Sequence, residues 1–378
     1  MSERFAKAIA FINELKDQKS KYTRDVPNKL ARIYGINRDK GRPDTFKDSS
    51  FLCIRSYNGD VGVRPFSGNT FWLSPDINIS PISQIGDFTT ELEAGKSYNL
   101  STRLHNRGDV IVPYPKVEFF LTDPTLGFNT AVAKYLGVTQ LQAMLLPDSN
   151  GEANFLYNVP MTESGHKCLF ARTYSFSPSD KPFDLHLLDP RLDRHIAQKN
   201  LNFVPQNSAY AFNLIHQPNA NETIEFAPLT KDQVHAIQHP TLRSLKIGNI
   251  RNAELLRNIK IELTGDSAAK LSREREGTAW SFNVAGRNGL DLDYQSSLLK
   301  RTESIIQAVY AGKSTFADYK KELSAFREMN KAAVKTSMQI TIPDLGLRKG
   351  AAAAFNIVNT NTLNGEIKGG ITVVVIGK

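Results

Sequence analysis

Cysteine is scarce in this chain, which holds only Cys53 and Cys168 among its 378 residues. Two cysteines cannot build a disulfide framework, and no CxxC pair of the kind found in metal sites is present. The two residues could pair with each other. The segments "FLCIR" and "KCLFA" around them look like strand interiors, however, where cysteine packs as a small apolar side chain. We therefore expect two buried thiols.

Long apolar runs are also missing. No stretch approaches the roughly 18 apolar residues that a membrane-spanning helix needs, so we predict no membrane span. The first residues space their apolar side chains three or four apart between Lys and Glu, whereas a secretory signal gathers them in one block. We expect a protein made in the cytoplasm. Its final location is open, including export or assembly on a secreted or surface particle without a signal peptide.

The common catalytic and nucleotide-binding motifs are absent, since the sequence has no H-E-x-x-H, no GxxxxGK[ST] and no GxGxxG. His235 and His239 have a helical spacing that suits metal ligands, but Pro240 follows at once. Asp291 and Asp293 lack the rest of a calcium loop, and an exposed strand or a helix N-terminus explains them. We predict no catalytic residue, no cofactor and no metal ligand.

Negative charge is under-represented, and the imbalance is local. The formal net charge is +9, and residues 1–50 hold 12 Lys and Arg against 7 Asp and Glu. A basic arm on a nearly neutral body can meet an acidic protein surface, nucleic acid or anionic lipid, or it can simply be solvated.

Within this arm, residues 2–18 have the apolar stripe of an amphipathic helix. Such a helix packs on its own domain or docks on a neighbouring subunit. Tyrosines among the basic residues that follow could stack on nucleic-acid bases, but no known reader fold accompanies them, so we do not expect a nucleic-acid partner. The candidate interaction residues are Phe5, Ile9, Ile12, Leu15, Tyr22 and Tyr34.

Residues 51–205 alternate in the manner of β-strands separated by Gly, Pro and Asn turns. In "LSPDINISP" (73–81), Pro75 and Pro81 bracket an alternating run, and proline belongs at strand ends or edges. We expect this run to be the edge strand that opens an immunoglobulin-like sandwich. Residues 50–66 alternate in the β manner around an Asn-Gly turn at 58–59. Further strands are predicted at 97–106, 116–123, 152–159, 166–176 and 198–204, with 131–146 as a short helix or two more strands.

Residues 206–378 predict a second sandwich, with strands at 209–217, 222–229, 258–265, 335–344, 352–361 and 369–378. Between about 292 and 331 the apolar residues recur at helical spacing, and "AGKSTF" breaks the run. This pattern predicts a helical hairpin inserted in the second sandwich. Its apolar stripe looks too wide for one small sandwich to cover. The predicted fold class is therefore mainly β: two immunoglobulin-like β-sandwiches, an N-terminal helical arm and an inserted helical hairpin.

The pieces "FWLSPDINI", "STRLHNRGD", "KVEFF" and "DRHIAQKNLNFV", in this order, resemble a bacterial immunoglobulin-like, cell-adhesion-related β-sandwich module. Modules of this kind are found beside gametolysin-type peptidase domains. The resemblance covers about residues 70–205, and the peptidase motif is absent. It implies a non-catalytic structural or binding module, commonly in extracellular bacterial proteins.

The motif residues also have a physical interpretation. Asn and Gly in "HNRG" tolerate the backbone conformation with which a chain leaves a strand, and "DRH" directly precedes the last strand of the motif. We predict a structural polar cluster that ties down the end of the sandwich, in preference to a ligand site. Its residues are Asn106, Arg107, Asp193, Arg194 and His195.

We predict a non-catalytic structural or interaction protein, a subunit of a bacterial or phage-like multi-protein assembly that acts through its sandwich surfaces and its arm. Its partners would be proteins, as a homo-oligomer or a larger assembly. One alternative is an adhesin that binds carbohydrate or a host surface through loop aromatics such as Phe71, Trp72 and Trp280. Another is an enzyme with an unrecognised site.

Overall fold

The computed structural model describes residues 46, 49–66, 68, 70–83, 87–127, 129–249, 259–264, 269–273, 279–286, 289–362 and 364–377. The predicted helix at 2–18 and the candidate interaction residues between Phe5 and Tyr34 lie outside the described residues, so they stay predictions.

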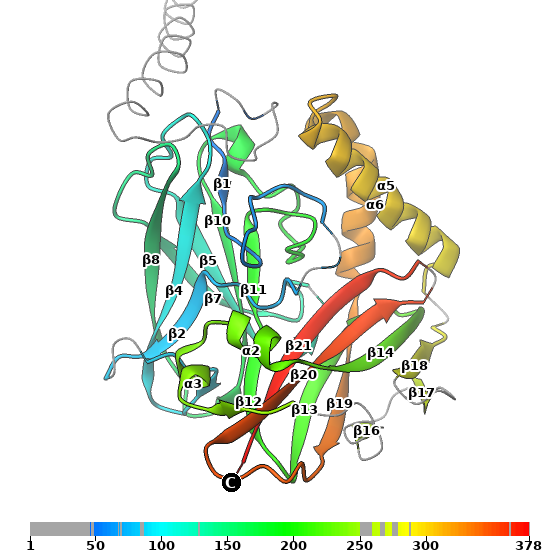
Figure 1. Cartoon of the computed structure of the whole chain (residues 1–378). Coiled ribbons are helices and arrows are strands. Elements are labelled where there is room, and N and C mark those ends of the chain that lie inside the picture. The colour runs from blue at the N-terminus through cyan, green and yellow to red at the C-terminus, as the bar shows by residue number, and fades with distance from the viewer. Residues whose placement is uncertain are drawn as a thin grey trace, which may run out of the picture.

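The first sandwich packs two antiparallel sheets face to face (Figure 1). In one sheet β4 (Ser97–Asn106) has β8 (Ser149–Asn158) on one edge and both β2 (Ile77–Pro81) and β1 (Leu52–Cys53) on the other. The other sheet has the order β11 (Ile196–Lys199), β10 (Cys168–Tyr174), β5 (Lys116–Thr122) and β7 (Lys134–Gln140). A short ladder joins β3 (Glu91–Leu92) to β9 (Gly165–His166), and a 3-10 turn, η2, spans Pro178–Asp180.

Alternation explains why these strands bury one face. Along β4 the side chains of Tyr98, Leu100 and Leu104 are buried, as a period of two predicts, and they join one apolar core with residues from both sheets. The ambiguous segment 131–146 contains a strand, β7, and no helix.

The second sandwich has a large sheet with the order β12 (Leu201–Pro205), β21 (Ile367–Ile376), β20 (Ala351–Asn361), β14 (Ala220–Pro228), β18 (Ala279–Val284) and β17 (Lys270–Arg273). A short strand, β15 (Lys246–Ile247), pairs with the start of β20. The facing sheet has the order β16 (Lys260–Leu263), β19 (Val334–Ile342), β13 (Ser208–His216) and β6 (Thr125–Leu126).

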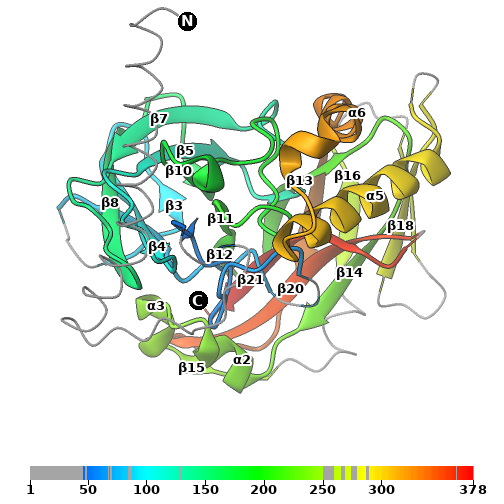
Figure 2. The same ribbon diagram turned by 90° about the horizontal axis from the view of Figure 1, so that it is seen from above.

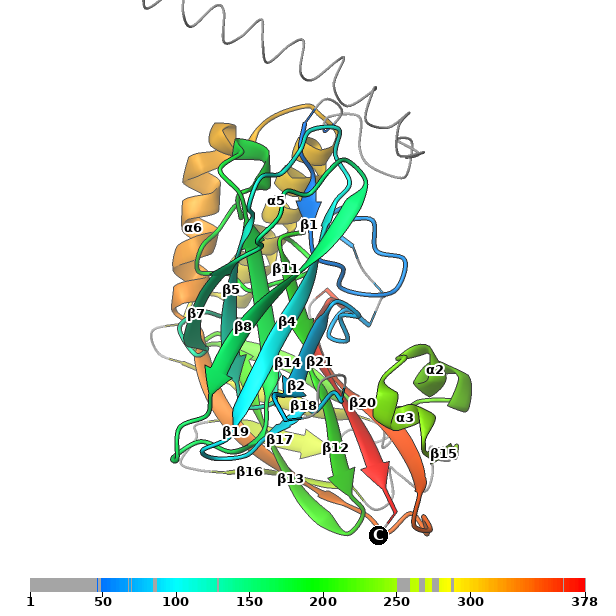
Figure 3. The ribbon, with the colours of Figure 1, turned by 90° about the vertical axis from the view of Figure 1, so that its left-hand side faces the viewer.

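The chain passes from one sandwich to the other without a linker. β11 pairs with β10 in the first sandwich, and β12 runs parallel to β21 in the second, with only Asn200 between them (Figure 3). The predicted single strand at 198–204 is therefore wrong, because the alternation continues through the point where the pairing partner changes. Residues 201–205, which we expected in the first sandwich, pair with the second.

The β-alternation predicted for 50–66 is also mostly wrong, since only β1 pairs there, but the predicted turn at 58–59 is present. The loop after it turns through Gly59 and Gly62, both at positive φ, and is held by the buried ion pair of Asp60 and Arg64.

The helical hairpin lies between β18 and β19, as predicted, and consists of α5 (Leu292–Tyr310), η3 (Phe316–Tyr319) and α6 (Lys320–Lys331). Two shorter helices, α2 (Lys231–Ala236) and α3 (Pro240–Arg243), lie on the opposite side of the molecule (Figures 2 and 3). The apolar face of the hairpin packs against residues of the first sandwich. The cluster comprises Phe46, Phe51, Leu187, Leu192, Leu298, Ile306, Tyr310, Phe326 and Met329.

The wide apolar stripe predicted for the hairpin is thus buried within the same chain, against the 183–192 segment of the first sandwich. For the described residues the predicted fold class is confirmed: the chain is mainly β, with two sandwiches and a helical hairpin inserted in the second.

Candidate functional site

Asn106, the last residue of β4, ties the end of the first sandwich to its loops. Its Nδ2 donates to the carbonyl oxygens of Val110 (2.9 Å) and Leu145 (3.1 Å). Its Oδ1 accepts from the N–H groups of Phe51 (3.3 Å) and Gly108 (3.0 Å). A Cβ at Gly108 would lie 2.3 Å from a backbone oxygen, so the "NRG" turn needs glycine for the close approach of two chain segments.

Asp193 and His195 form a buried pair before β11. The Nδ1 of His195 lies 2.7 Å from Oδ1 of Asp193, and the other carboxylate oxygen accepts from the N–H of Phe183. Burial alone would raise the pKa of Asp193, but the neighbouring His195 and Arg194 lower it below its usual value. Burial lowers the pKa of His195, so the pair holds an ionised carboxylate and a neutral imidazole that donates from Nδ1.

Arg194 is fully enclosed at the junction of the first sandwich with α5. Its guanidinium donates to the carbonyl oxygen of Leu52 and to the hydroxyl of Tyr310, both at 3.1 Å, and lies 3.5 Å from the Asp180 carboxylate. The ring of Phe51 covers it at 4.3 Å. This side chain therefore fastens the hairpin to the first sandwich.

Three of the five predicted cluster residues meet at the start of β1, where Asn106 bonds to Phe51 and Arg194 bonds to Leu52, whereas Asp193 and His195 form a pair of their own. Arg107 is half-buried beside them, and its N–H donates to the carbonyl oxygen of Phe51. The structural role predicted for these five residues stays a prediction.

Further buried ionic groups gave no signal in the sequence. Arg64 pairs with Asp60 at 2.9 Å with both side chains enclosed. Arg191 pairs with Asp189 at 2.6 Å and also with Glu366 on the loop before β21. Their partners are either too close in sequence to look unusual or more than a hundred residues away.

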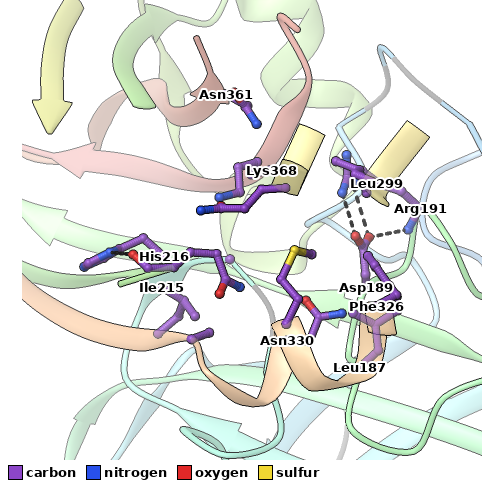
Figure 4. A pocket seen from close by; sticks show the side chains of 15 residues that line it. Leu187, Asp189, Arg191, Ile215, His216, Leu299, Phe326, Asn330, Asn361 and Lys368 are labelled. Carbon is purple, nitrogen blue, oxygen red and sulfur yellow. Dashed lines mark hydrogen bonds and ion pairs between the residues drawn. The ribbon is translucent and has the colours of Figure 1, made fainter. Parts of the chain in front are cut away.

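A small cavity lies where the hairpin, the 187–191 segment and the end of the second sandwich meet (Figure 4). Its volume is about 80 Å³, which is room for two or three water molecules. Arg191 and Asp189 line one side of it, and His216, Asn361 and Lys368 line the other.

His216 faces this cavity as a fully bonded imidazole. Its Nδ1 lies 2.6 Å from the carbonyl oxygen of Gln217, and its Nε2 lies 2.8 Å from Oγ1 of Thr336. Burial lowers its pKa, so it is the neutral tautomer that donates from Nδ1 and accepts at Nε2. Arg191, Asp189, His216 and Lys368 around the cavity thus all bond to other groups of the protein.

A larger, open groove of about 420 Å³ crosses the outer face of the β2–β4–β8 sheet. Phe88 borders it, and Asn99, Arg103 and Glu152 supply polar groups. The distance from Nη2 of Arg103 to Oε2 of Glu152 is 3.8 Å. An aromatic ring beside several amide and charged groups is suited to a polar ligand such as a sugar.

The outer edge of β7 is unpaired, since no further strand is hydrogen-bonded to it among the described residues, although Phe155 of β8, in the facing sheet, lies close to Gly137. Tyr135 and Val138 on this strand are 51% and 47% exposed. An unpaired strand edge with exposed apolar side chains is a template for pairing with another chain.

Other candidates from the sequence lie elsewhere. The aromatics suggested for an adhesin, Phe71, Trp72 and Trp280, are at most 5% exposed, so they are core residues and not a binding platform. His235 is exposed on α2, whereas His239 is buried and caps α3, accepting from the N–H of Thr241 at 3.3 Å, so the two do not face a common ion.

Several remaining sequence features have local explanations. Asp291 is the N-cap of α5 and accepts from the N–H of Asp293. Cys53 and Cys168 are buried free thiols. Among the described residues, no group of His, Cys, Asp and Glu could hold a metal ion, and no helix is long and apolar enough to cross a membrane.

Comparisons with known proteins give low scores. No family model matches, and no curated protein matches. The CARDB domain of a Pyrococcus furiosus protein, solved with di-metal ions, is 11% identical with a TM-score of 0.20, over 33% of this chain and 86% of that chain. The CupB6 tip adhesin from Pseudomonas aeruginosa is 10% identical with a TM-score of 0.18, over 80% of this chain and 97% of that chain.

A bacterial adhesin from Mobiluncus mulieris, which contains intramolecular disulfide, isopeptide and ester cross-links, is 8% identical with a TM-score of 0.19, over 56% of this chain and 93% of that chain. Scores at this level transfer no function to the chain.

Proposed function

We propose that the chain is a non-catalytic structural protein that assembles with copies of itself through the open edge of β7. The observation that carries the proposal is this edge, a strand of seven residues to which no further strand is hydrogen-bonded among the described residues, with half-exposed Tyr135 and Val138. Two copies related by a two-fold axis would pair β7 with β7 antiparallel, extending the β11–β10–β5–β7 sheet across the interface.

Two further features support this proposal. The body beyond residue 50 is nearly neutral, with 35 Lys and Arg against 31 Asp and Glu, so copies do not repel each other strongly. The two sandwiches are joined by the ion pair of Arg191 with Glu366 and by the buried hydrogen bond from Trp72 to Thr372, as expected for a rigid building block. Such a subunit suits a bacterial surface, secreted or phage-like particle.

Light scattering of the full-length protein over a range of concentrations tests this function. We expect a dimer or larger species, which Val138→Lys converts to a monomer because a charge on the edge opposes strand addition. Val63→Lys is the matched control, since Val63 is a loop valine of comparable exposure, 37%, and this variant should still assemble. A protein that is monomeric at every concentration would refute the proposal.

The second candidate is the adhesin, favoured by the groove beside Phe88. Arg103 and Glu152 would orient a polar ligand there, and the aromatic ring would pack on its apolar face. A glycan array with the full-length protein distinguishes the two. Sugar binding by a monomer that is lost in Glu152→Gln supports the adhesin, whereas an oligomer that binds no glycan supports the structural subunit.

A further inference from the structure

Three side chains meet at the end of the second sandwich, on neighbouring strands. The carboxylate of Glu222 on β14 accepts a hydrogen bond from Nδ2 of Asn359 on β20, at 2.6 Å, through Oε2. Its other oxygen, Oε1, accepts from Nζ of Lys368 on β21. One carboxylate thus bridges an amine and a carboxamide that come from different strands.

The strand register creates this arrangement. β14 and β20 place Glu222 opposite Asn361, and β20 and β21 place Asn359 opposite Gly369. The register then shifts, because Thr360 lies opposite Ile367, so Lys368 is the extra residue of a bulge. A bulge redirects a side chain, and here it turns the amine toward Glu222.

The site is enclosed. Glu222 is 1% exposed and Asn359 is fully buried, and the Lys368 side chain, at 24%, reaches in from the cavity of Figure 4. The Oδ1 atom of Asn359 is buried and has no hydrogen-bond partner among the described residues. A buried carboxamide oxygen without a donor is costly, and the ion pair of Glu222 with Lys368 does not satisfy it.

We propose that Lys368 and Asn359 join in a self-catalysed amide cross-link, with Glu222 carrying the protons. Nζ of Lys368 passes a proton to Oε1 of Glu222 and becomes a neutral amine. A half-turn of the protonated carboxyl brings this O–H to the side of Asn359, and the carboxamide also turns over. The O–H then donates to Oδ1, which gives that oxygen its missing donor and polarises the Cγ=O bond.

The amine then attacks Cγ of Asn359, and a C–N bond forms as the carbonyl double bond opens. The tetrahedral centre collapses when the bond from Cγ to Nδ2 breaks, and Glu222 relays the proton that the leaving nitrogen needs. An ammonium side chain and a primary carboxamide become a secondary amide and an ammonium ion, so no oxidant or cofactor is required. Fixing the reactants beside one carboxylate supplies the proximity and the proton transfer.

Mass spectrometry of the full-length protein tests the proposal. We expect an intact mass lower than that of the sequence by one molecule of ammonia. Loss of ammonia alone would also arise from a succinimide at an asparagine, so peptide mapping decides. Trypsin with a Glu-specific protease cuts after Lys349 and Glu366, which separates residues 350–366 from 367–378, and trypsin also cuts after residue 368 unless Lys368 is cross-linked. The two peptides stay joined only if the side chains are bonded.

Lys368→Arg keeps a cation for Glu222 but removes the attacking amine, and Glu222→Gln removes the proton carrier. Both variants should have the full sequence mass and separate peptides. Lys134→Met is the control, because Lys134 pairs with Glu163 without a carboxamide in the pair, and it should keep the cross-link. Folded wild-type protein of full sequence mass, or ammonia loss with separable peptides, overturns the proposal.

Discussion

Trp72 and Thr372 lie 300 positions apart in the chain, yet Nε1 of the indole donates a 3.0 Å hydrogen bond to Oγ1 of the threonine. Trp72 precedes β2 of the first sandwich, and Thr372 lies within β21 of the second. This buried contact, together with the bonds from Asn200 to the carbonyl oxygens of Thr125 (2.8 Å) and Gly370 (2.9 Å), joins the two sandwiches into one packed body.

Replacing Gly370 should loosen this junction. A Cβ at Gly370 would lie 2.3 Å from the indole of Trp72, so Gly370→Ala forces the ring out of place and should lower the free energy of unfolding by about 1–3 kcal/mol. Urea unfolding followed by tryptophan fluorescence measures this. Gly248→Ala is the control, since its Cβ would meet nothing closer than 3.8 Å. Equal stability of the two variants would contradict the packing argument.

The strands and helices with strict periodicity could be predicted from the sequence because one face of each packs on a core. The inserted hairpin is the clearest example, and its helices lie where the spacing of Leu298, Ile306 and Phe326 places them. The alternating pattern did not predict the change of sandwich at Asn200, because alternation shows that a strand has a buried face but not which strand pairs with it.

Contacts that depend on distant partners could not be predicted. Glu222, Asn359 and Lys368 are ordinary polar residues in the sequence, and only the register of β14, β20 and β21 brings them together. Trp72 was expected at a loop surface, but it is buried because the second sandwich covers the loop.

Removing the charge of Arg194 should be strongly destabilising. Arg194→Met leaves the enclosed Asp180 without its cation and deletes the bonds to Leu52 and Tyr310, so we expect a loss of about 3–5 kcal/mol. Chemical denaturation measures the difference. Arg103→Met removes an exposed arginine whose ion pair with Glu152 is solvated, and it should change the stability by less than about 1 kcal/mol.

Acid should weaken the fold through His239. Burial, with the nearby charge of Lys199, lowers the pKa of His239 to about 3, whereas the unfolded chain has about 6.5. The unfolded state therefore binds more protons between these values, so this stability is complete above about pH 6.5 and is lost at about 1.4 kcal/mol per pH unit below it.

Urea unfolding at pH 7.5 and pH 5 tests this with His239→Asn, which keeps a side-chain acceptor for the N–H of Thr241 but does not titrate. The wild type should lose about 2 kcal/mol more than this variant over the interval. His235→Asn, on the exposed α2, should behave as the wild type. A pH response that is the same in both variants would show that His239 is not its source.

The two thiols should react only when the protein unfolds. Burial, followed by the charge of Asp60, raises the pKa of Cys53 to about 12, and burial raises that of Cys168 to about 12. The thiolate is the reactive form, so both conditions for alkylation, access and ionisation, are missing in the native state. We expect no labelling by a maleimide in native buffer and two labels in denaturant.

The two thiols should also become reactive in a fixed order in Arg194→Met. Cys53 lies in β1 beside the Arg194 junction, whereas Cys168 accepts from Nε2 of Gln198 at 3.0 Å inside the first sandwich, so this variant should expose Cys53 to labelling before Cys168. Simultaneous labelling of both at the global unfolding rate would show that the junction does not open separately.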